Sequence, residues 1–570
     1  MRPPRIGNLL PVNRQTAGSW VFAALCLAGG LAAFAAPLAN PDIFWHLSAG
    51  RWMAAHRCLP RADWLSSTMS GQPWTDFEWL VQVLWQGVAL AAGLRGLWAL
   101  KLALCAAGMA LLWDILSRCG LRPAARGLAV FVWALAQAAI SDLRPENFSM
   151  LFFLALWRWL EGRRLEGWSA PLSRAELAGL CLGFAFWANL HPGFVYGLAL
   201  LAVFAAARGL RAPAGPCRWT AAACLAAAAL AVLANPYGPR IYLVPWLHGA
   251  WLGDLQTFIG EWQPPSLLNR WHWAFWGVFL GTFGVVLRRA WARRDVPLEH
   301  LAALLVFGLS AAFCARTALY FLCVAVPVGA SALARPGRLP LVGAAAALWL
   351  FFFAQVAPRL DLARPLARAC APQRLAGFLE DEKPALAGLK MLNPWAWGGY
   401  LGYRLYPDFR VFMDGRYIFH PLLRPLHEAS REPSLYQAFL DRHGIGLVVH
   451  VRDASRVDEP VALGGRGRRT LSRPAYLFFL PRDQWALVCW DEQGEVFVRR
   501  SAVSPAWLAV REYRYFRPQD LDAAALMVRE GLVRSEDVSR EAERFAAWAG
   551  DGPQAREARL WLRSLAAPRP

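Results

Sequence analysis

The chain has 570 residues, of which 57% are hydrophobic, and a mean hydropathy of +0.29. Apolar runs of about 15 to 23 residues recur as far as Phe353, and runs of this length can cross a bilayer as helices, which excludes a soluble multidomain protein. The formal net charge is +20, but in the apolar part the basic residues lie in short loops between runs. This arrangement reflects membrane topology and does not indicate nucleic-acid binding. The cysteines include no CxxC pair, so we expect neither a zinc site nor a disulfide framework.

Arginine clusters divide the apolar part of the chain into pairs of runs. The positive-inside rule places each cluster in the cytoplasm and predicts about eleven spans, with the N-terminus inside and the C-terminus outside. We interpret the first run as a retained helix and not as a cleaved signal peptide. The expected spans are residues 17–39, 96–116, 127–141, 147–160, 176–189, 192–207, 219–234, 271–287, 297–313, 317–333 and 339–356. Residues 78–92 are expected to form an interfacial or re-entrant outer helix, because counting them as a span would invert every later loop.

With this topology, the motifs rich in unusual polar residues all fall on the outer side. They are "NPDIFWHLSAGRW" (40–52), "SGQPWTDFEWL" (70–80), "SDLRPENF" (141–148), "WANLHPGF" (187–194), "ANPYGPR" (234–240), "IGEWQPP" (259–265) and "CARTALY" (314–320). Each has a purely structural explanation: Asn235 can begin a turn, Arg144 can extend toward the lipid headgroups, and His191 before a proline can end a helix. Their common side nevertheless favours one active or binding face outside the cytoplasm.

The composition changes after Phe353. We expect residues 1–357 to form a transmembrane domain with a first outer loop at 40–95, and residues 358–570 to form a soluble extracytoplasmic α/β domain. The strand-like segments of the second domain are 410–414, 445–451, 485–490 and 495–500, and a mostly helical tail begins near Pro518. The aromatic, glycine-rich stretch 393–416 is expected to end a strand at an Asp-Gly turn and to pack its aromatic side chains on the membrane.

This layout resembles the GT-C superfamily of membrane glycosyltransferases, which use sugars linked to polyprenyl phosphate. The resemblance covers the whole chain and implies a catalytic carboxylate in the first outer loop. By position that residue is Asp42, with Glu78 and Asp76 as rivals at the far end of the loop.

A second resemblance concerns residues 395–416, which are loosely similar to the Trp-Trp-Asp-Tyr-Gly segment of oligosaccharyltransferase catalytic subunits. The aromatic frame is kept by Trp395, Trp397, Gly398, Gly399 and Tyr400. The acidic residue of that segment is missing, so recognition of an Asn-glycosylation sequon is not implied. Protein O-mannosyltransferases are also loosely similar. The motifs look most like an uncharacterised bacterial branch, which implies an inner-membrane enzyme of the cell envelope.

The implied reaction is attack of an acceptor hydroxyl on the anomeric carbon of a lipid-phosphate sugar. Its transition state has oxocarbenium character and gathers negative charge on the leaving phosphate. A carboxylate base is worth about a hundred- to ten-thousandfold in rate, and cationic groups can hold the phosphate. We expect Asp42 or Glu78 to be the base. His46, one helical turn from Asp42, could orient it or contact the phosphate.

The expected substrate-binding residues lie at outer helix ends and in the aromatic stretch. They are Arg144, Glu146, Asn189, His191, Glu261, Arg316, Trp397, Tyr400, Asp414 and Arg416. Among them, Arg316, His191 and Arg144 are the candidates to hold the phosphate. No metal ligand set is required, although a divalent cation, Mg or Mn, could bridge Asp42, Glu78 and the phosphate. The expected partners are the polyprenyl-phosphate sugar donor, the lipid bilayer and a glycan, lipid or protein acceptor.

Three other functions stay open. A transporter or flippase of lipid-linked intermediates would usually have internal repeats and broken helices with ionisable groups near mid-membrane, and we find no convincing case of either. An O-antigen-ligase or polymerase type of enzyme would share the donor chemistry, and the outer loop at 235–270 with Glu261 keeps this alternative open. The third is a non-catalytic scaffold.

Overall fold

The computed structural model describes residues 17–138, 142–168, 172–211, 219–292, 294–333, 338–462, 468–550 and 552–566. Some arginines of the clusters that predict the topology lie outside the described residues. They are those at 2, 5, 14, 218, 293 and 335. The chain divides into two compact units, which we describe separately. The first unit contains residues up to 40, 49–59 and 75–367, and the second contains 41–48, 60–74 and 368–570.

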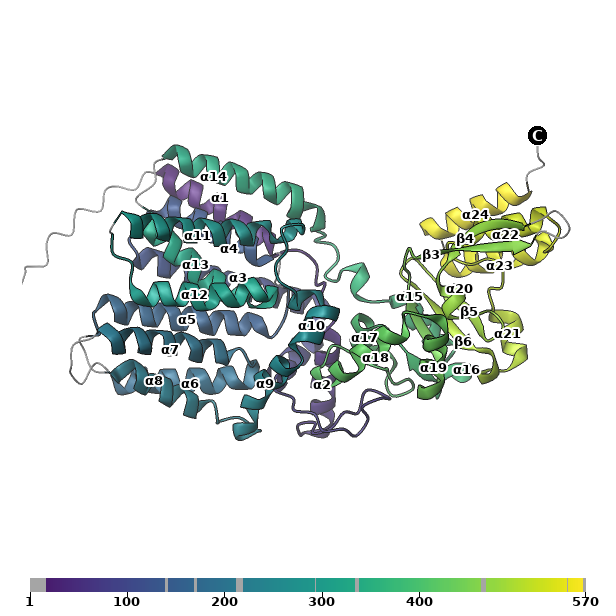
Figure 1. Ribbon diagram of the computed structural model, residues 1–570, viewed down its shortest axis with the longest axis horizontal. Coiled ribbons are helices and arrows are strands. Elements are labelled where there is room, and N and C mark those ends of the chain that lie inside the picture. Colours follow the sequence, from purple (N-terminus) through teal and green to yellow (C-terminus); the bar gives the residue numbers. More distant parts are fainter. Residues whose placement is uncertain are drawn as a thin grey trace, which may run out of the picture. The chain divides into compact units, whose positions relative to one another are not determined.

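The first unit is helical, and its long helices run side by side along roughly one direction (Figure 1). They are α1 (Ala17–Ala33), α3 (Trp79–Arg118), α4 (Pro123–Ala138), α5 (Glu146–Leu165), α6 (Arg174–Leu190), α7 (Phe194–Arg211), α8 (Thr220–Ala231), α11 (Trp273–Trp291), α12 (Leu298–Phe313), α13 (Ala318–Ala332) and α14 (Arg338–Phe351), with the short α9 (Leu243–Ala250) and α10 (Leu252–Phe258). Each expected span falls mainly on one of these helices.

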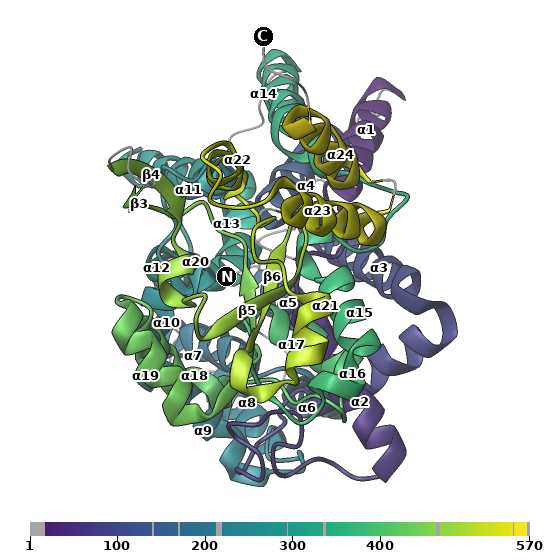
Figure 2. The ribbon, with the colours of Figure 1, turned by 90° about the vertical axis from the view of Figure 1, so that its right-hand side faces the viewer.

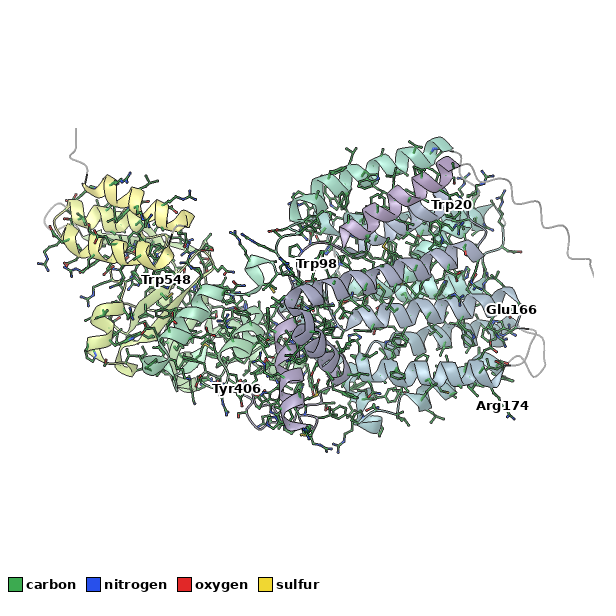
Figure 3. All side chains as sticks on the ribbon, turned by 180° about the vertical axis from the view of Figure 1, so that it is seen from behind. Trp20, Trp98, Glu166, Arg174, Tyr406 and Trp548 are labelled. Atoms are coloured by element: carbon green, nitrogen blue, oxygen red, sulfur yellow. The ribbon has the colours of Figure 1, made fainter. Side chains whose placement is uncertain are left out.

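Three helical segments of the described residues are long and apolar enough to cross a membrane, by length and composition. They are Trp79–Arg118, Ala315–Ala332 and Pro340–Arg359, and shorter apolar helices accompany them. In Figure 3, Trp98 lies toward one end of this unit, and Glu166 and Arg174 lie toward the other. Helix α13 is buried at every position from Ala318 to Gly329, as expected of a helix that is apolar on all sides.

Helix α3 contains both the expected outer helix (78–92) and the expected second span (96–116), with a break between them. The break is at Gly93, whose φ of 60° and ψ of −156° are not helical. Glycine tolerates this positive φ because it has no Cβ. Beyond the break, Lys101 is buried and pairs with Asp142 at 3.2 Å. Asp142 also accepts hydrogen bonds from the backbone N–H groups of Ala39 and Asn40, so the ion pair fixes the chain just before Asp42.

The second unit contains a four-stranded sheet in the order β1-β2-β6-β5 and a separate hairpin, β3-β4. The strands are β1 (Lys390–Leu392), β2 (Ile445–Val451), β3 (Arg456–Ala462), β4 (Arg468–Pro474), β5 (Trp485–Trp490) and β6 (Gly494–Arg499). Among the described strands, β1 and β2 pair in parallel, and the other pairs are antiparallel. Figure 2 shows β5 and β6 side by side. The strand predictions at 445–451, 485–490 and 495–500 are confirmed.

Some helices of this unit pack against the sheet, and the chain after Pro518 is mostly helical, as expected. The helices of the unit are α15 (Gln373–Asp381), α16 (Lys383–Leu386), α17 (Trp395–Leu405), α18 (His420–Ala429), α19 (Pro433–His443), α20 (Tyr476–Phe479), α21 (Pro505–Arg511), α22 (Leu521–Arg529), α23 (Ser535–Ala549) and α24 (Pro553–Ala566). Helix α2 (Ile43–His56) contributes its residues up to Ser48 to this unit and the rest to the first. Trp490 of β5 stacks on Phe545 of α23, with 3.9 Å between ring centroids.

The strand predicted at 410–414 is wrong. Only one bridge forms there, between Val411 and Ser66, because other groups satisfy the neighbouring backbone. Ser67 donates its backbone N–H to the carbonyl of Val411 at 2.8 Å. The side chain of Asn393 accepts the backbone N–H of Phe412 at 2.7 Å. The Asn393 side chain and the Ser67 backbone therefore bond to the Phe412 N–H and the Val411 carbonyl, which would otherwise bond to a neighbouring strand.

Candidate active site

Six of the expected site residues meet in the first unit, and we call them the polar cluster: Glu78, Arg144, Glu146, His191, Glu261 and Arg316. Arg316 bonds to Glu146 through Nε and to Glu261 through Nη1, the latter at 2.8 Å. Arg144 contacts the second oxygen of Glu261 at 2.5 Å. Two guanidinium groups and two carboxylates therefore form one partly buried chain of ion pairs.

Local backbone structure explains how distant segments supply this chain. Glu146 is the first residue of α5, where the positive end of the helix dipole favours a carboxylate. Glu261 lies in a short 3-10 helix, Gly260–Trp262. The backbone N–H of Ala315 donates to the carbonyl of Gln263 at 2.9 Å, which ties the segment before α13 to the Glu261 segment. The guanidinium of Arg316 also lies 5.2 Å from the ring centroid of Trp262.

His191 ends α6, as the structural explanation predicted, and it also belongs to the polar cluster. Its Nε2 atom lies 3.8 Å from an oxygen of Glu78 and 3.8 Å from an oxygen of Glu146. Burial lowers the pKa of His191 well below its ordinary value, and the positive charge of Arg316 lowers it further. The low pKa favours the neutral imidazole, so we keep His191 among the candidates to hold the phosphate as a hydrogen-bonding group.

Asn189 connects the helix before His191 to the start of α3. Its side-chain oxygen accepts a hydrogen bond from the indole of Trp79 at 3.0 Å. Its amide nitrogen donates to the carbonyls of Ala185 and Ala234, each at 2.8 Å. Because Trp79 follows Glu78 directly, these bonds fix the position at which Glu78 enters the cluster.

The other expected site residues belong to the second unit: Asp42, His46, Trp397, Tyr400, Asp414 and Arg416. Asp42 directly precedes α2. Its carboxylate occupies space left by Gly415, because a Cβ at Gly415 would lie 2.0 Å from Asp42 Oδ1. His46 is 2% exposed, and its ring lies against that of Trp45 with 3.6 Å between centroids. The two rival carboxylates, Asp42 and Glu78, thus belong to different units.

Arg416 forms a buried ion triad with Asp414 and with Asp63, a residue that the sequence interpretation missed. Its Nη2 lies 2.7 Å from Asp63 and 2.8 Å from Asp414, and all three side chains are at most 1% exposed. Burial opposes the charge of Asp63, but Arg416 and hydrogen bonds from Ser66 outweigh it and lower the pKa of Asp63. The triad therefore fastens part of the first outer loop to the Asp-Gly-Arg segment.

The aromatic, glycine-rich stretch is explained by close packing inside the second unit. Trp397 and Tyr400 are 5% and 4% exposed, so their expected packing on the membrane is wrong. A Cβ at Gly398 would lie 1.8 Å from the carbonyl oxygen of Met413, and one at Gly399 would lie 3.0 Å from that of Pro41. The glycines allow α17 to approach these backbones closely.

The described residues contain no group of three or more His, Cys, Asp or Glu side chains that could hold a metal ion. In the polar cluster, Glu146 and Glu261 are already paired with arginines. The oxygen-rich donor set would suit a hard cation, but this arrangement does not form a site for one. The expected Mg or Mn therefore stays a prediction, and no step below depends on it.

Comparison with known proteins gives matches only among solved structures. No family model and no curated protein matches the chain. The oligosaccharyltransferase AglB of Archaeoglobus fulgidus, in complex with an inhibitory peptide and a dolichol-phosphate, aligns with a TM-score of 0.55 and 10% identity, covering 95% of this chain and 84% of AglB. This chain has the fold of AglB. The predicted resemblance to GT-C glycosyltransferases is thus confirmed for the fold.

Two further structures of the Archaeoglobus fulgidus oligosaccharyltransferase align less well. One is tethered with an acceptor peptide containing the NVT sequon, with 10% identity, a TM-score of 0.49 and coverage of 77% of this chain and 69% of that chain. The other is a complex with Zn and sulfate, with 11% identity, a TM-score of 0.44 and coverage of 75% and 67%.

Proposed function

We propose that this chain is a membrane glycosyltransferase that moves a sugar from a polyprenyl-phosphate-linked donor to an acceptor on the extracytoplasmic face of the bacterial inner membrane. The observation that carries the proposal is the polar cluster, which joins two arginines, three carboxylates and a neutral imidazole in a helical unit. The AglB fold supports it, because the AglB structure is a complex with dolichol-phosphate, itself a polyprenyl phosphate.

Arg316 is the residue best placed to contact the donor phosphate. Its Nε and Nη1 groups bind carboxylates, but its Nη2 group has no hydrogen-bond partner among the described residues. The side chain is 28% exposed, so a ligand can reach it. Phosphate binding would add a charge-assisted bond to a guanidinium that Glu146 and Glu261 already hold in place. Arg144 is the second cation of the same cluster.

In the proposed reaction, Asp42 removes the proton of the acceptor hydroxyl, and Glu78 is the alternative base. The hydroxyl oxygen then forms a bond to the anomeric carbon as the bond to the lipid phosphate breaks. The leaving phosphate takes the electron pair, and the arginines stabilise its growing charge. We assign Asp414 and Arg416 to holding the first outer loop in place, because their charged groups already engage each other and Asp63.

An Arg316→Ala protein tests the phosphate contact. We expect its KM for the polyprenyl-phosphate sugar to rise about ten- to a hundredfold, because a hydrogen bond to a charged group is worth about 1.5 to 3 kcal/mol. Stability is also expected to fall, because Glu146 and Glu261 lose their shared partner. The matched control is Arg118→Ala, whose partner is the exposed Asp114. Unchanged donor dependence in Arg316→Ala, with the control behaving as wild type, would remove Arg316 from the site.

The proposed topology is tested with thiol labelling. Cys58 is an exposed native cysteine in the first outer loop, and Ser430, exposed in the second unit, can be replaced by cysteine. We expect a membrane-impermeant maleimide to label both positions in cells with an intact inner membrane. The Ser430→Cys variant is made in a Cys58→Ser background, so that labelling at position 430 is measured separately. Glu166→Cys, in a loop predicted to be cytoplasmic, is the matched control and should react only after permeabilisation. The reverse pattern would contradict the topology.

A further inference from the structure

Helix α9 exposes an apolar face. Leu243, Trp246 and Leu247 lie three and four residues apart, which places them on one face of the helix. They are 55%, 75% and 40% exposed, whereas Val244, on another side of α9, is 2% exposed. Proteins rarely leave a contiguous apolar patch in contact with water, so this face requires an apolar cover.

The position of α9 in its unit indicates the membrane surface as the cover. Figure 1 shows α9 and α10 at one end of the long helices, the end at which Figure 3 labels Trp98. In the proposed topology this is the outer end. Tryptophan and arginine side chains, which are common at the level of the lipid headgroups, follow α9 in the chain. Trp273, at the start of α11, is 53% exposed, and the guanidinium carbon of Arg359 lies 3.1 Å from the ring centroid of Trp271.

Exposed apolar side chains also connect this face to the spans on both sides of it. Leu230, in the last turn of α8, is 67% exposed, Leu268, before α11, is 98% exposed, and Leu280, within α11, is 64% exposed. Helices α8 and α11 are expected spans, and the outward apolar side chains of a span contact acyl chains. Because such side chains recur from one span through α9 to the next, the partner that fits this face is the acyl chains of the outer leaflet.

The other side of α9 contacts the surroundings of the polar cluster. His248 lies four residues after Val244, and its Nδ1 lies 2.8 Å from the carbonyl oxygen of Val244. The His248 ring stacks on the ring of Trp262, with 5.7 Å between centroids. The guanidinium of Arg316 lies 5.2 Å from the centroid of the same Trp262 ring. One helix thus joins an apolar outer face to the neighbourhood of the arginine that we propose contacts the donor phosphate.

We propose that α9 is an interfacial helix whose exposed apolar face lies among the phospholipid acyl chains of the outer leaflet, and that it holds Arg316 at the depth of the lipid phosphates. An interfacial helix buries its apolar face about 5 to 10 Å into the boundary between headgroups and acyl chains. The phosphate of a lipid-linked donor lies at a similar depth. The membrane contact does not depend on catalysis, whereas the placement of Arg316 rests on the proposed function.

A fluorescent label tests the membrane contact without an activity assay. Full-length Leu247→Cys protein, in a Cys58→Ser background, is labelled with the environment-sensitive fluorophore NBD and reconstituted in nanodiscs with or without nitroxide-labelled phospholipids. We expect blue-shifted emission that the nitroxide lipids quench at least about twofold. Leu280→Cys is the lipid-facing control and Ser430→Cys the water-facing control. The Cys58→Ser protein gives the background from the remaining cysteines.

Two results of this measurement would overturn the proposal. Emission at Leu247→Cys as in water, with no more quenching than at Ser430→Cys, would show that α9 lies in an aqueous loop. Blue-shifted emission without quenching would show that protein, and not lipid, covers the face. Quenching in a protein that transfers no sugar would support the membrane contact and contradict the proposed function alone.

The placement of Arg316 is tested with the double variant Leu243→Ser/Trp246→Ser. Because both side chains are exposed, we expect thermal stability in detergent to change little. In nanodiscs we expect KM for the donor to rise about three- to tenfold with kcat unchanged, because α9 loses its hold in the leaflet. Leu435→Ser, at a position 49% exposed in α19, is the matched control. An unchanged KM in the double variant, with quenching at Leu247→Cys, would overturn the placement of Arg316.

Discussion

The Asp42→Asn protein is expected to transfer sugar at least about a hundredfold more slowly than wild type while it still folds and binds the donor. Asparagine has the shape of aspartate but cannot accept a proton. The alternative is that Asp42 only caps α2, which it directly precedes. Asparagine caps helices as well as aspartate does, so a capping role predicts almost no effect of the same substitution.

A second variant moves the carboxylate without changing it. In Gly415→Ala, the new Cβ would collide with Asp42 Oδ1, so the carboxylate must shift. We expect activity to fall here as well, although every ionisable group is retained. Gly377→Ala is the matched control, because a Cβ there meets nothing within 4 Å. Glu78→Gln is measured beside these variants. Full activity in Asp42→Asn with loss in Glu78→Gln would move the base to Glu78.

Replacing Arg416 by methionine is expected to destabilise the protein by about 3 to 5 kcal/mol, because it leaves Asp63 and Asp414 buried without their shared cation. The guanidinium also contacts the rings of Trp64, Trp74 and Phe419 at 4.9 to 5.8 Å. Denaturant unfolding of the purified protein, followed by tryptophan fluorescence, measures the change.

The control for this substitution is Arg404→Met. Arg404 makes a two-pronged ion pair with Glu380, but both side chains are 37% exposed, and pairs of this kind are worth at most about 1 kcal/mol. Equal losses in the two variants would contradict the anchoring role of the triad. A loss confined to Arg416→Met would support it.

The sequence predicted the helices of the first unit well, because long apolar runs determine both their length and their type. It also predicted β2, β5 and β6, which are short runs of β-branched and aromatic residues. It failed between residues 393 and 416. There, α17 contains three glycines that favour neither helix nor strand, and contacts with Pro41, Leu65 and Met413 decide the outcome. Contacts between segments so distant in sequence leave no local periodic pattern.

The sequence predicted the six residues of the polar cluster as site residues, but it did not predict which of them contact each other. The positive-inside rule placed Glu146, His191, Glu261 and Arg316 on one side, and the structure brings them together. The pairing of the arginines with the glutamates could not be read from spacing, because the partners in each pair come from distant segments: Arg144 pairs with Glu261, and Arg316 pairs with Glu146 and Glu261. Asp63 was missed because its partner lies more than three hundred residues away.

The central claim is that this chain transfers sugar from a lipid phosphate. The most direct test is an assay of purified wild-type protein in lipid nanodiscs with a polyprenyl-phosphate sugar and an extract of cell-envelope acceptors, with release of polyprenyl phosphate as the measured quantity. The Asp42→Asn/Glu78→Gln double variant is run in parallel. We predict release by wild type and none above background by the double variant. Equal release by both proteins, or donor binding without any release by wild type, would contradict the account.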